Sequence, residues 1–462
     1  MIHTRRTGIA IALLIAAAMA AQLAAYWPGV MIWDSIRQYR QALSGRYDDW
    51  HPPAMNWLWH QLLAIHAGPA PMLVLQALIG WGGIALLAGW AVRAGRPRLA
   101  AALVACALMP IPFALGGAVI KDSLMAAFTL LAAGLIACTH GRAGWRLRAM
   151  GLAALVAAST LRFNALPATL PLAVALLPAH WRETRANLVA ATLLLAVPLA
   201  LAMPAANRLL DAQRSGVGLS LVIFDLGGIT KESGADAFPP LDLADPVAID
   251  RRCYDPEKWD SYAWWVDAPC PIGFDRVGAA LRRQGANPYA FLARAILRHP
   301  WAYARHRLHH FAINSRLLAR GPVERPVFAE SDPNPWGYRV APGPLLAAID
   351  RAALWSAATP IGWPIWWMAL AAGVLILWRR LETGWLAGPL ALSSLLYGLF
   401  YLAVSVASEM RYHLWTVEAA ALATVIAAAD LVNGAPAPRR RLALALAPVV
   451  LVTLIAGAWR LA

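Results

Sequence analysis

Charged residues are scarce in this sequence. Of its 462 residues only 14% are Asp, Glu, Lys or Arg, and only 25 are acidic. Soluble domains carry about 25% charged residues, so this scarcity excludes a chain whose surroundings are mainly water. The balance is made up by 60% hydrophobic residues, with 22 Trp among the aromatics, and the mean hydropathy is +0.53. The composition predicts a polytopic membrane protein.

The sequence has neither a phosphate-binding loop with a Walker lysine nor any other nucleotide-binding pattern, which argues against an ATP-driven pump. The net charge of +15 does not indicate nucleic acid, because basic and aromatic residues are not interleaved on a soluble domain. In a membrane protein this positive charge bears instead on which loops face the cytoplasm.

Long apolar runs recur along the chain, and each can cross a hydrocarbon core of about 30 Å at a rise of ~1.5 Å per residue. The first run has no clear cleavage site before Tyr26 and is expected to be a retained anchor, not a signal peptide. The expected spans are 8–25, 71–92, 99–115, 124–138, 186–206, 361–378, 385–407, 414–431 and 442–459.

The run from 150 to 178 has two interpretations, because Arg162, Asn164 and Pro167 lie in its middle. It is either one long span or two short spans that meet at the outer surface. Short loops rich in Arg are cytoplasmic, and only two spans put all six short Arg clusters on one side. These clusters are Arg5/Arg6, Arg93/Arg96/Arg98, Arg142/Arg146/Arg148, Arg182/Arg185, Arg379/Arg380 and Arg439/Arg440/Arg441.

The expected fold is therefore an all-α polytopic membrane protein with about 11 transmembrane helices, its N-terminus in the cytoplasm and its C-terminus outside. Residues 1–206 form an N-terminal transmembrane region with catalytic outer loops, and residues 351–462 a C-terminal one. Residues 207–350 form a large extracytoplasmic loop domain of mixed or irregular structure. Within it, apolar and Arg residues at helical spacing from 287 to 320 are typical of amphipathic interfacial helices. For most of those arginines, membrane anchoring without chemistry is the favoured interpretation.

Only four cysteines are present. Cys106 and Cys138 lie in expected spans and are interpreted as small apolar fillers. Cys253 and Cys270 lie in the long loop with 16 residues between them, a spacing that a disulfide could close in an oxidising compartment. Two free thiols remain the alternative, because spacing alone does not establish pairing.

The predicted topology brings ionisable residues from separate outer loops to one face. An ionisable residue at the edge of the membrane is costly and is by default a hypothesis of function. Carboxylates that meet Lys and Arg suit a reaction in which a hydroxyl loses its proton while a phosphate is neutralised. The residues are Asp34, Lys121, Asp122, Arg162, Glu409, Arg411 and His413.

Transfer of a sugar from a polyprenyl phosphate is such a reaction. The donor lipid lies in the bilayer and its phosphate at the interface, where Lys121, Arg162 and Arg411 are expected. An acceptor hydroxyl is a poor nucleophile near neutral pH, so a carboxylate must take or position its proton. The phosphate leaving group needs charge stabilisation more than a general acid.

These residues resemble the GT-C superfamily of lipid-dependent glycosyltransferases, near the protein mannosyltransferases and aminoarabinose transferases. The resemblance covers most of the membrane part. The resemblance implies that Asp34 is the catalytic base or orients the acceptor, that Asp122 is the second catalytic acid, and more loosely that Lys121, Arg162 and Arg411 lie near the lipid phosphate. The motifs that carry it are "WDS" at 33–35, "YDDWHPP" at 47–53, "KD" at 121–122, "LRFNAL" at 161–166, "HPWAYARHRL" at 299–308 and "RYH" at 411–413.

The first loop departs from the family pattern. Many members carry two adjacent acids there, whereas Asp34 stands alone and Asp48 and Asp49 follow only later, which leaves open which carboxylate is the base. Asp34 could be a helix N-cap, and Asp48 and Asp49 could form a turn. A lone His51 near Trp is more often structural, and Lys121 could merely reach towards the interface.

Asp49, His51 and His413 complete the candidate substrate-binding residues. Whether a metal takes part stays open: a carboxylate pair with His51 could hold a divalent ion, while two or three basic residues could neutralise the phosphate without one. The expected partners are a polyprenyl-phosphate sugar, a glycan, lipid or protein acceptor, and membrane lipids, with no nucleic acid. The expected location is the cytoplasmic (inner) membrane, with the large loop periplasmic or extracellular.

Two other functions remain as alternatives. A polysaccharide polymerase or ligase with a pyrophosphate-linked donor would also have a large outer loop with His and Arg. A lipid or solute transporter, such as a flippase, should show repeat symmetry and broken helices at the bilayer midplane, and neither is clear in the sequence.

Overall fold

The computed structural model describes residues 2–140, 144–320 and 325–462, with side chains from residue 5 onward. Arg142, one of the clustered arginines, lies outside the described residues. The chain divides into two compact units. The bundle unit comprises residues 1–214, 325–398 and 410–454, and the loop unit comprises residues 215–324, 399–409 and 455–462.

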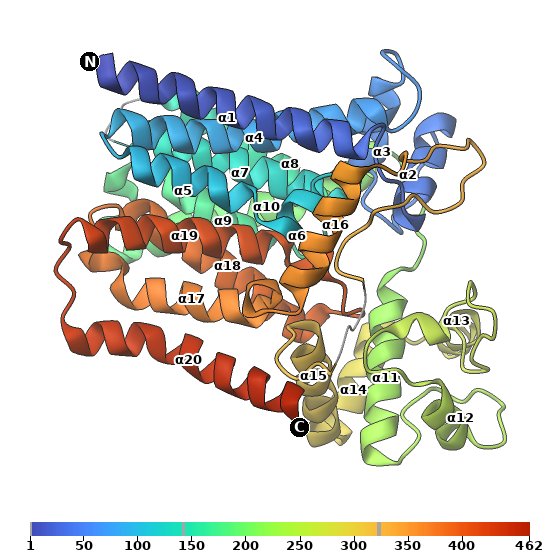
Figure 1. Cartoon of the computed structure of the whole chain (residues 1–462). Coiled ribbons are helices and arrows are strands. Elements are labelled where there is room, and N and C mark those ends of the chain that lie inside the picture. The colour runs from blue at the N-terminus through green and yellow to red at the C-terminus, as the bar shows by residue number, and fades with distance from the viewer. Residues whose placement is uncertain (1, 141–143, 321–324) are drawn as a thin grey trace. The chain divides into compact units, whose positions relative to one another are not determined.

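Helices make up nearly all of the regular structure in the bundle unit. Figure 1 shows its long helices running side by side, and the short helices α2 and α3 lie at one end of them. The helices are α1 (Ile2–Tyr26), α2 (Trp33–Ser44), α3 (Ala54–Leu62), α4 (Ala70–Arg93), α5 (Pro97–Ala107), α6 (Pro110–Leu115), α7 (Lys121–Thr139), α8 (Trp145–Ser159), α9 (Leu166–Leu176), α10 (Arg185–Leu209), α16 (Pro344–Ala357), α17 (Pro364–Leu377), α18 (Gly384–Val404), α19 (Leu414–Val432) and α20 (Arg439–Leu461). The last residues of α18 and α20 belong to the loop unit.

The all-α polytopic membrane class is confirmed. Within the described ranges, seven helices are long and apolar enough to cross a membrane: α1, α4, α7, α10, α18, α19 with the turn before it, and α20. The other predicted spans coincide with shorter helices. The 99–115 run is interrupted before Pro110, since the residue preceding a proline is disfavoured in helix. The number of spans stays a prediction.

The ambiguous run from 150 to 178 forms two helices, α8 and α9, separated by a turn that holds Arg162. Contacts show which helix ends lie together. Asp34, just after α1, bonds Lys121 at the start of α7 and Arg411 between α18 and α19. Arg162 pairs with Asp122, also at the start of α7. The α8–α9 turn therefore lies at the same end of the bundle as Asp34, which we call the Asp34 end.

Arginines gather at the opposite end of the bundle unit. Arg96, between α4 and α5, pairs with Asp430 at the end of α19 and with Glu382 before α18. Arg148 in α8 donates to the carbonyl of Leu176 at the end of α9. This alternation of ends agrees with the arginine distribution used to predict the topology, while the side of the membrane that each end faces stays a prediction.

The loop unit contains more helix than the sequence suggested. The segment "LSLVIFDLGGI", expected in an irregular region, forms most of α11 (Gly218–Ser233). Two glycines let side chains from other segments approach this helix closely. A Cβ at Gly227 would lie 2.3 Å from the Tyr262 hydroxyl, and a Cβ at Gly228 would lie 2.1 Å from the His306 ring. The other helices are α12 (Pro246–Cys253), α13 (Phe274–Arg283), α14 (Pro288–Arg298) and α15 (Pro300–Asn314).

A disulfide joins Cys253, at the end of α12, to Cys270, with a Cα–Cα distance of 5.7 Å. It ties α12 to the segment that precedes α13. Cys106 is buried and Cys138 half-buried, and both are free thiols.

The two-helix arrangement predicts where reporter groups will be found. A reporter inserted after Pro178 should be cytoplasmic and one near Gly234 external, because only this arrangement keeps every short Arg cluster inside. Fusions or cysteine-accessibility labelling in intact cells would measure this. An external signal next to His180 would contradict the eleven-span topology.

The disulfide predicts a redox-dependent labelling pattern. Cys253 and Cys270 should resist alkylation in the denatured, non-reduced protein and react after reduction, because a bridged sulfur carries no thiolate. Mass spectrometry of the peptides would measure the pattern, with Cys106 and Cys138 as internal positive controls. Labelling of both loop cysteines without reductant would reject the bridge.

Candidate active site

The start of α2 fixes the position of Asp34. Extended backbone at Ile32 precedes the helix, and the Ser35 hydroxyl accepts a hydrogen bond from the Ile32 N–H. The same hydroxyl donates to the carbonyl of Val119 at 2.6 Å, which ties α2 to the segment before α7. Asp34 therefore lies in the first turn of α2, where a negative charge is favourable, and the N-cap position belongs to Ile32.

Asp34 is bonded by two cations from distant parts of the chain. Its Oδ2 accepts a hydrogen bond of 2.6 Å from Lys121 Nζ and one of 2.7 Å from Arg411 Nη1. Lys121 is the first residue of α7, and Arg411 lies in the short 3₁₀ turn Met410–His413 that precedes α19. Both cations are buried and Asp34 is largely so. The four-residue set of Asp34, His51, Lys121 and Arg411 is called the Asp34 cluster.

His51 completes the Asp34 cluster. Its Nδ1 lies 3.2 Å from Lys121 Nζ, and its Nε2 lies 3.6 Å from Asp34 Oδ1. An ammonium can only donate hydrogen bonds, so Nδ1 must be the acceptor. The ring proton is then on Nε2, facing the carboxylate.

The electrostatics assign a protonation state to each of these two side chains. Burial opposes ionisation of Asp34, but the positive charges of Arg411 and Lys121 outweigh it and hold the pKa of Asp34 well below its ordinary value. Burial, aided by Lys121 and Arg411, outweighs the attraction of Asp34 and lowers the pKa of His51 to about 3. Near neutral pH the cluster contains an anionic carboxylate and a neutral imidazole.

A second ion pair stands next to the Asp34 cluster. Arg162 Nη1 bonds Asp122 Oδ1, and Arg162 Nε donates to Asn164 Oδ1 at 3.0 Å. The ring of Tyr412 links the two sets: its centroid lies 4.8 Å from the Arg162 guanidinium and 5.4 Å from that of Arg411. Asp122 is only 3% exposed, so its contact with Arg162 is shielded from solvent.

The other predicted residues lie in adjoining segments. Asp48 forms the expected turn, accepting from the Trp50 N–H and pairing with Arg37 at 2.7 Å. Asp49 is half-buried and donates its backbone N–H to the carbonyl of Gln213. His413 is fully buried at the end of the turn that holds Arg411.

Sequence reasoning missed a second carboxylate near Asp34. Asp332 Oδ2 accepts a hydrogen bond of 2.8 Å from the Trp33 N–H, and its own N–H donates to the carbonyl of Met31. Burial and the charge of Asp34 raise the pKa of Asp332, although the Trp33 N–H opposes this rise. The segment "SDPNP" at 331–335 reads as a turn, and nothing local in it points to Asp34, some 300 positions earlier.

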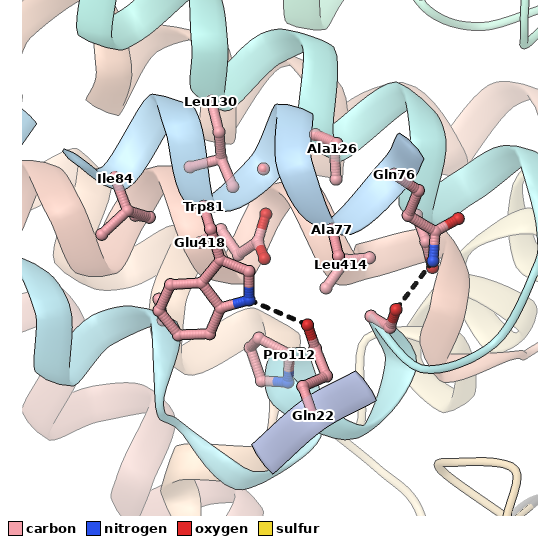
Figure 2. A pocket seen from close by; sticks show the side chains of 15 residues that line it. Gln22, Gln76, Ala77, Trp81, Ile84, Pro112, Ala126, Leu130, Leu414 and Glu418 are labelled. Atoms are coloured by element: carbon pink, nitrogen blue, oxygen red, sulfur yellow. Dashed lines mark hydrogen bonds between the residues drawn. The ribbon is translucent and has the colours of Figure 1, made fainter. Parts of the chain in front are cut away.

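A cavity of about 50 Å³ lies within the helices of the bundle unit. Figure 2 shows the indole N–H of Trp81 bonded to Gln22 and the amide of Gln76 bonded to a backbone carbonyl, with Glu418 beside the cavity. Gln76 Oε1 and Glu418 Oε2 are buried, and neither has a hydrogen-bond partner among the described residues. Glu418 was missed, although an acid inside the apolar run 414–431 is itself a signal.

The side chains of the Asp34 cluster do not suit a metal ion. In the described part of the chain, no three His, Cys, Asp or Glu side chains are grouped so that they could hold one. Asp34 Oδ2, the best-placed oxygen, already accepts hydrogen bonds from two cations, so a divalent ion there would face their repulsion.

Comparison with solved structures found a similarity of fold. The chain is similar to the crystal structure of the Archaeoglobus fulgidus oligosaccharyltransferase, tethered with an acceptor peptide containing the NVT sequon via a disulfide bond. The identity is 14%, the TM-score is 0.31, and the match covers 98% of this chain and 55% of that chain. This chain thus spans about half the length of that structure, and a likeness of this degree carries no conclusion about activity. No protein-family profile and no curated protein matches the chain.

The geometry of His51 predicts that it does not titrate near neutral pH. Its NMR signals in the detergent-solubilised, histidine-labelled protein should stay those of a neutral Nε2–H imidazole between about pH 5 and 8, where an ordinary histidine changes charge. The variant His51→Gln would assign the signals. A midpoint near the ordinary value of 6.5 would contradict the buried cluster.

Proposed function

We propose that this protein is an integral membrane glycosyltransferase. It moves a sugar from a polyprenyl-phosphate donor to a hydroxyl of a glycan, lipid or protein acceptor at the outer face of the cytoplasmic membrane. The observation that carries this proposal is the convergence of Lys121 and Arg411 on the carboxylate of Asp34, at one end of a bundle of apolar helices.

Lys121 and Arg411 are the residues proposed to bind the donor phosphate. Each is held at the start of a membrane helix, where a lipid-linked phosphate would lie with its chain in the bilayer. Charge-assisted hydrogen bonds from Lys and Arg are the strong interactions that phosphate recognition uses. The phosphate would take over hydrogen bonds that Asp34 accepts in the substrate-free protein.

This exchange would also change the basicity of Asp34. A carboxylate held between two cations has a lowered pKa and is a weak base. When the phosphate draws Lys121 and Arg411 towards itself, the pKa of Asp34 rises, and its ability to accept a proton rises with it. Donor binding would thus prepare the base.

The proposed transfer involves the acceptor hydroxyl, the anomeric carbon of the donor and Asp34. The acceptor oxygen forms a bond to the anomeric carbon while its proton passes to Asp34. The bond from that carbon to the phosphate oxygen breaks, and its electron pair leaves with the polyprenyl phosphate, whose added charge Lys121 and Arg411 stabilise. Asp332 is the alternative base, because its pKa is raised and it lies near Asp34.

Asp122 and Arg162 have a different proposed role. Because Asp122 is buried and bonded to Arg162, it is expected to position that guanidinium beside Tyr412 and not to exchange protons with a substrate. Arg162 would then provide a third positive charge next to the phosphate site. A third positive charge would also suit a pyrophosphate-linked donor. Arg162 is therefore the feature that favours the second candidate function, a polysaccharide polymerase or ligase.

The lipid or solute transporter remains a separate candidate, because Glu418 lies beside a cavity within the membrane helices. An ionisable residue at such depth often marks a substrate pathway. Transport would need Glu418 but not the Asp34 cluster, whereas transfer would need the reverse.

Substitutions in the cluster should separate binding from chemistry. Asp34→Asn should lower single-turnover transfer by roughly 10² or more, because it removes the proton acceptor. Donor binding should be retained or tightened, because Lys121 and Arg411 lose their competing anion. Lys121→Ala and Arg411→Ala should instead weaken donor binding. Turnover and binding would be measured with purified protein and a panel of polyprenyl-phosphate sugars.

Arg46→Ala is the matched control for these variants, since Arg46 is an exposed cation in the same outer loop. It should behave as the wild type. Normal transfer by Asp34→Asn with loss in Asp332→Asn would move the base to Asp332. Normal transfer in both variants and in their double mutant would reject transfer by these carboxylates.

A further inference from the structure

We propose that an exposed face of α14 and α15 binds the anionic phospholipid headgroups of the membrane in which the protein is embedded. This face, called the Trp301 stripe, consists of Arg294, Leu297, Arg298, Trp301, Arg305 and Leu308. The proposal concerns the loop unit and does not depend on glycosyl transfer.

The stripe follows helical spacing. In α14 the neighbours Leu297 and Arg298 lie three and four residues after Arg294, and in α15 the positions 301, 305 and 308 are four and three residues apart. Positions three or four residues apart share one face of a helix. His299 separates the two helices with non-helical backbone (φ -132°, ψ 56°), so the spacing applies within each helix and not across the break. Three of the side chains therefore share a face of α14, and Trp301, Arg305 and Leu308 share a face of α15.

The apolar members of the stripe face outward. Leu297 is 80% exposed, Trp301 81% and Leu308 59%. The reverse side of the same helices packs within the loop unit, where Leu292 of α14 and His306 of α15 are buried. Since the helices already have a buried side, the exposed apolar side is a second surface that the described residues leave uncovered.

The mixture of residues on the stripe matches a lipid–water interface. Tryptophan is enriched at that level of the bilayer, and Arg can bury its stem while its guanidinium remains among headgroups. Arg294 and Arg298 form no ion pair among the described residues, and Arg305 lies 3.6 Å from Glu232. Guanidinium groups bind phosphate oxygens in a bidentate manner, so the stripe is chemically suited to anionic phospholipids.

The position of α15 argues for membrane as the partner. The C-terminal ends of membrane helices α18 and α20 belong to the same unit. Arg307 donates to the carbonyl of Ser405, just after α18. Beyond α15, the carbonyl of Arg316 accepts from Arg460 of α20, and the Arg320 guanidinium lies 4.5 Å from the Trp459 ring centroid. The end of α15 is thus fastened where two membrane helices end, which brings the stripe within reach of the headgroups.

The first experiment measures the depth of the stripe in the full-length protein, reconstituted in nanodiscs with phosphatidylglycerol. A nitroxide is attached through Trp301→Cys or, separately, Leu297→Cys, after Cys106→Ala and Cys138→Ala remove the free thiols. Both labels should collide more with oxygen, which partitions into lipid, than with a water-soluble nickel chelate. A label at Gln284→Cys, an exposed site elsewhere in the loop unit, should show the opposite order.

The second experiment measures lipid specificity through thermal unfolding. Adding phosphatidylglycerol to wild-type protein in phosphatidylcholine should raise the unfolding temperature. The triple variant Arg294→Gln, Arg298→Gln and Arg305→Gln should lose most of that rise. The triple control Arg251→Gln, Arg252→Gln and Arg282→Gln removes the same charge from exposed positions in the same unit and should keep the rise.

Three results would overturn the proposal. One is that the labels at 297 and 301 are as accessible to the water-soluble nickel chelate as the label at 284. Another is an equal loss of the lipid response in both triple variants, which would mean that only overall charge matters. The third is immobilised labels that do not gain oxygen accessibility, which would identify a protein partner as the occupant. None of these readouts uses transfer, so failure of the glycosyltransferase proposal would leave this test intact.

Discussion

The carboxylate of Asp34 is the point on which the arrangement of the Asp34 end depends. Two cations, each at the start of a different membrane helix, share one of its oxygens. Burying either cation without a counter-charge would be costly, since an unpaired charge at the membrane edge loses its hydration. The ion pairs therefore hold these helix ends together, and the Asp34–Arg411 pair joins segments 377 positions apart in the chain. Tyr412 then connects this set to Arg162 and its partner Asp122.

The sequence was informative where one physical rule acts on long segments. Apolar length predicts helices, and the distribution of Arg predicts that the 150–178 run contains two of them, as α8 and α9 show. The same rule placed Asp34, Lys121 and Arg411 at a common end, where the structure joins them. It could not predict which atoms meet. The proton on Nε2 of His51, for example, follows only from the position of Lys121.

Other features of the structure could not be predicted from local sequence patterns. Asp332 approaches Asp34 only because residues 331–332 bond the backbone at the start of α2, a contact no spacing rule predicts. The segment at 219–229 was expected to be irregular because it lies in a region rich in Asp, Pro and Gly, and its own paired glycines also disfavour helix. Here their missing side chains provide room for Tyr262 and His306, and tertiary packing outweighs the local preference. Glu418 had a usable signal, a lone acid among apolar residues, but no second residue in the sequence pointed to it.

The loop unit is discontinuous along the chain, and this has a consequence for biogenesis. Its main part ends at residue 324, but residues 399–409 and 455–462 complete it. Contacts such as those of Arg307 with Ser405 and of Arg316 with Arg460 cannot form until the last membrane helices have been made and inserted. During synthesis the loop unit therefore remains incompletely packed until α16 to α20 have left the ribosome. Helix insertion and completion of the loop unit are therefore coupled events, and a fault in the last helix would leave an earlier-made domain unfinished.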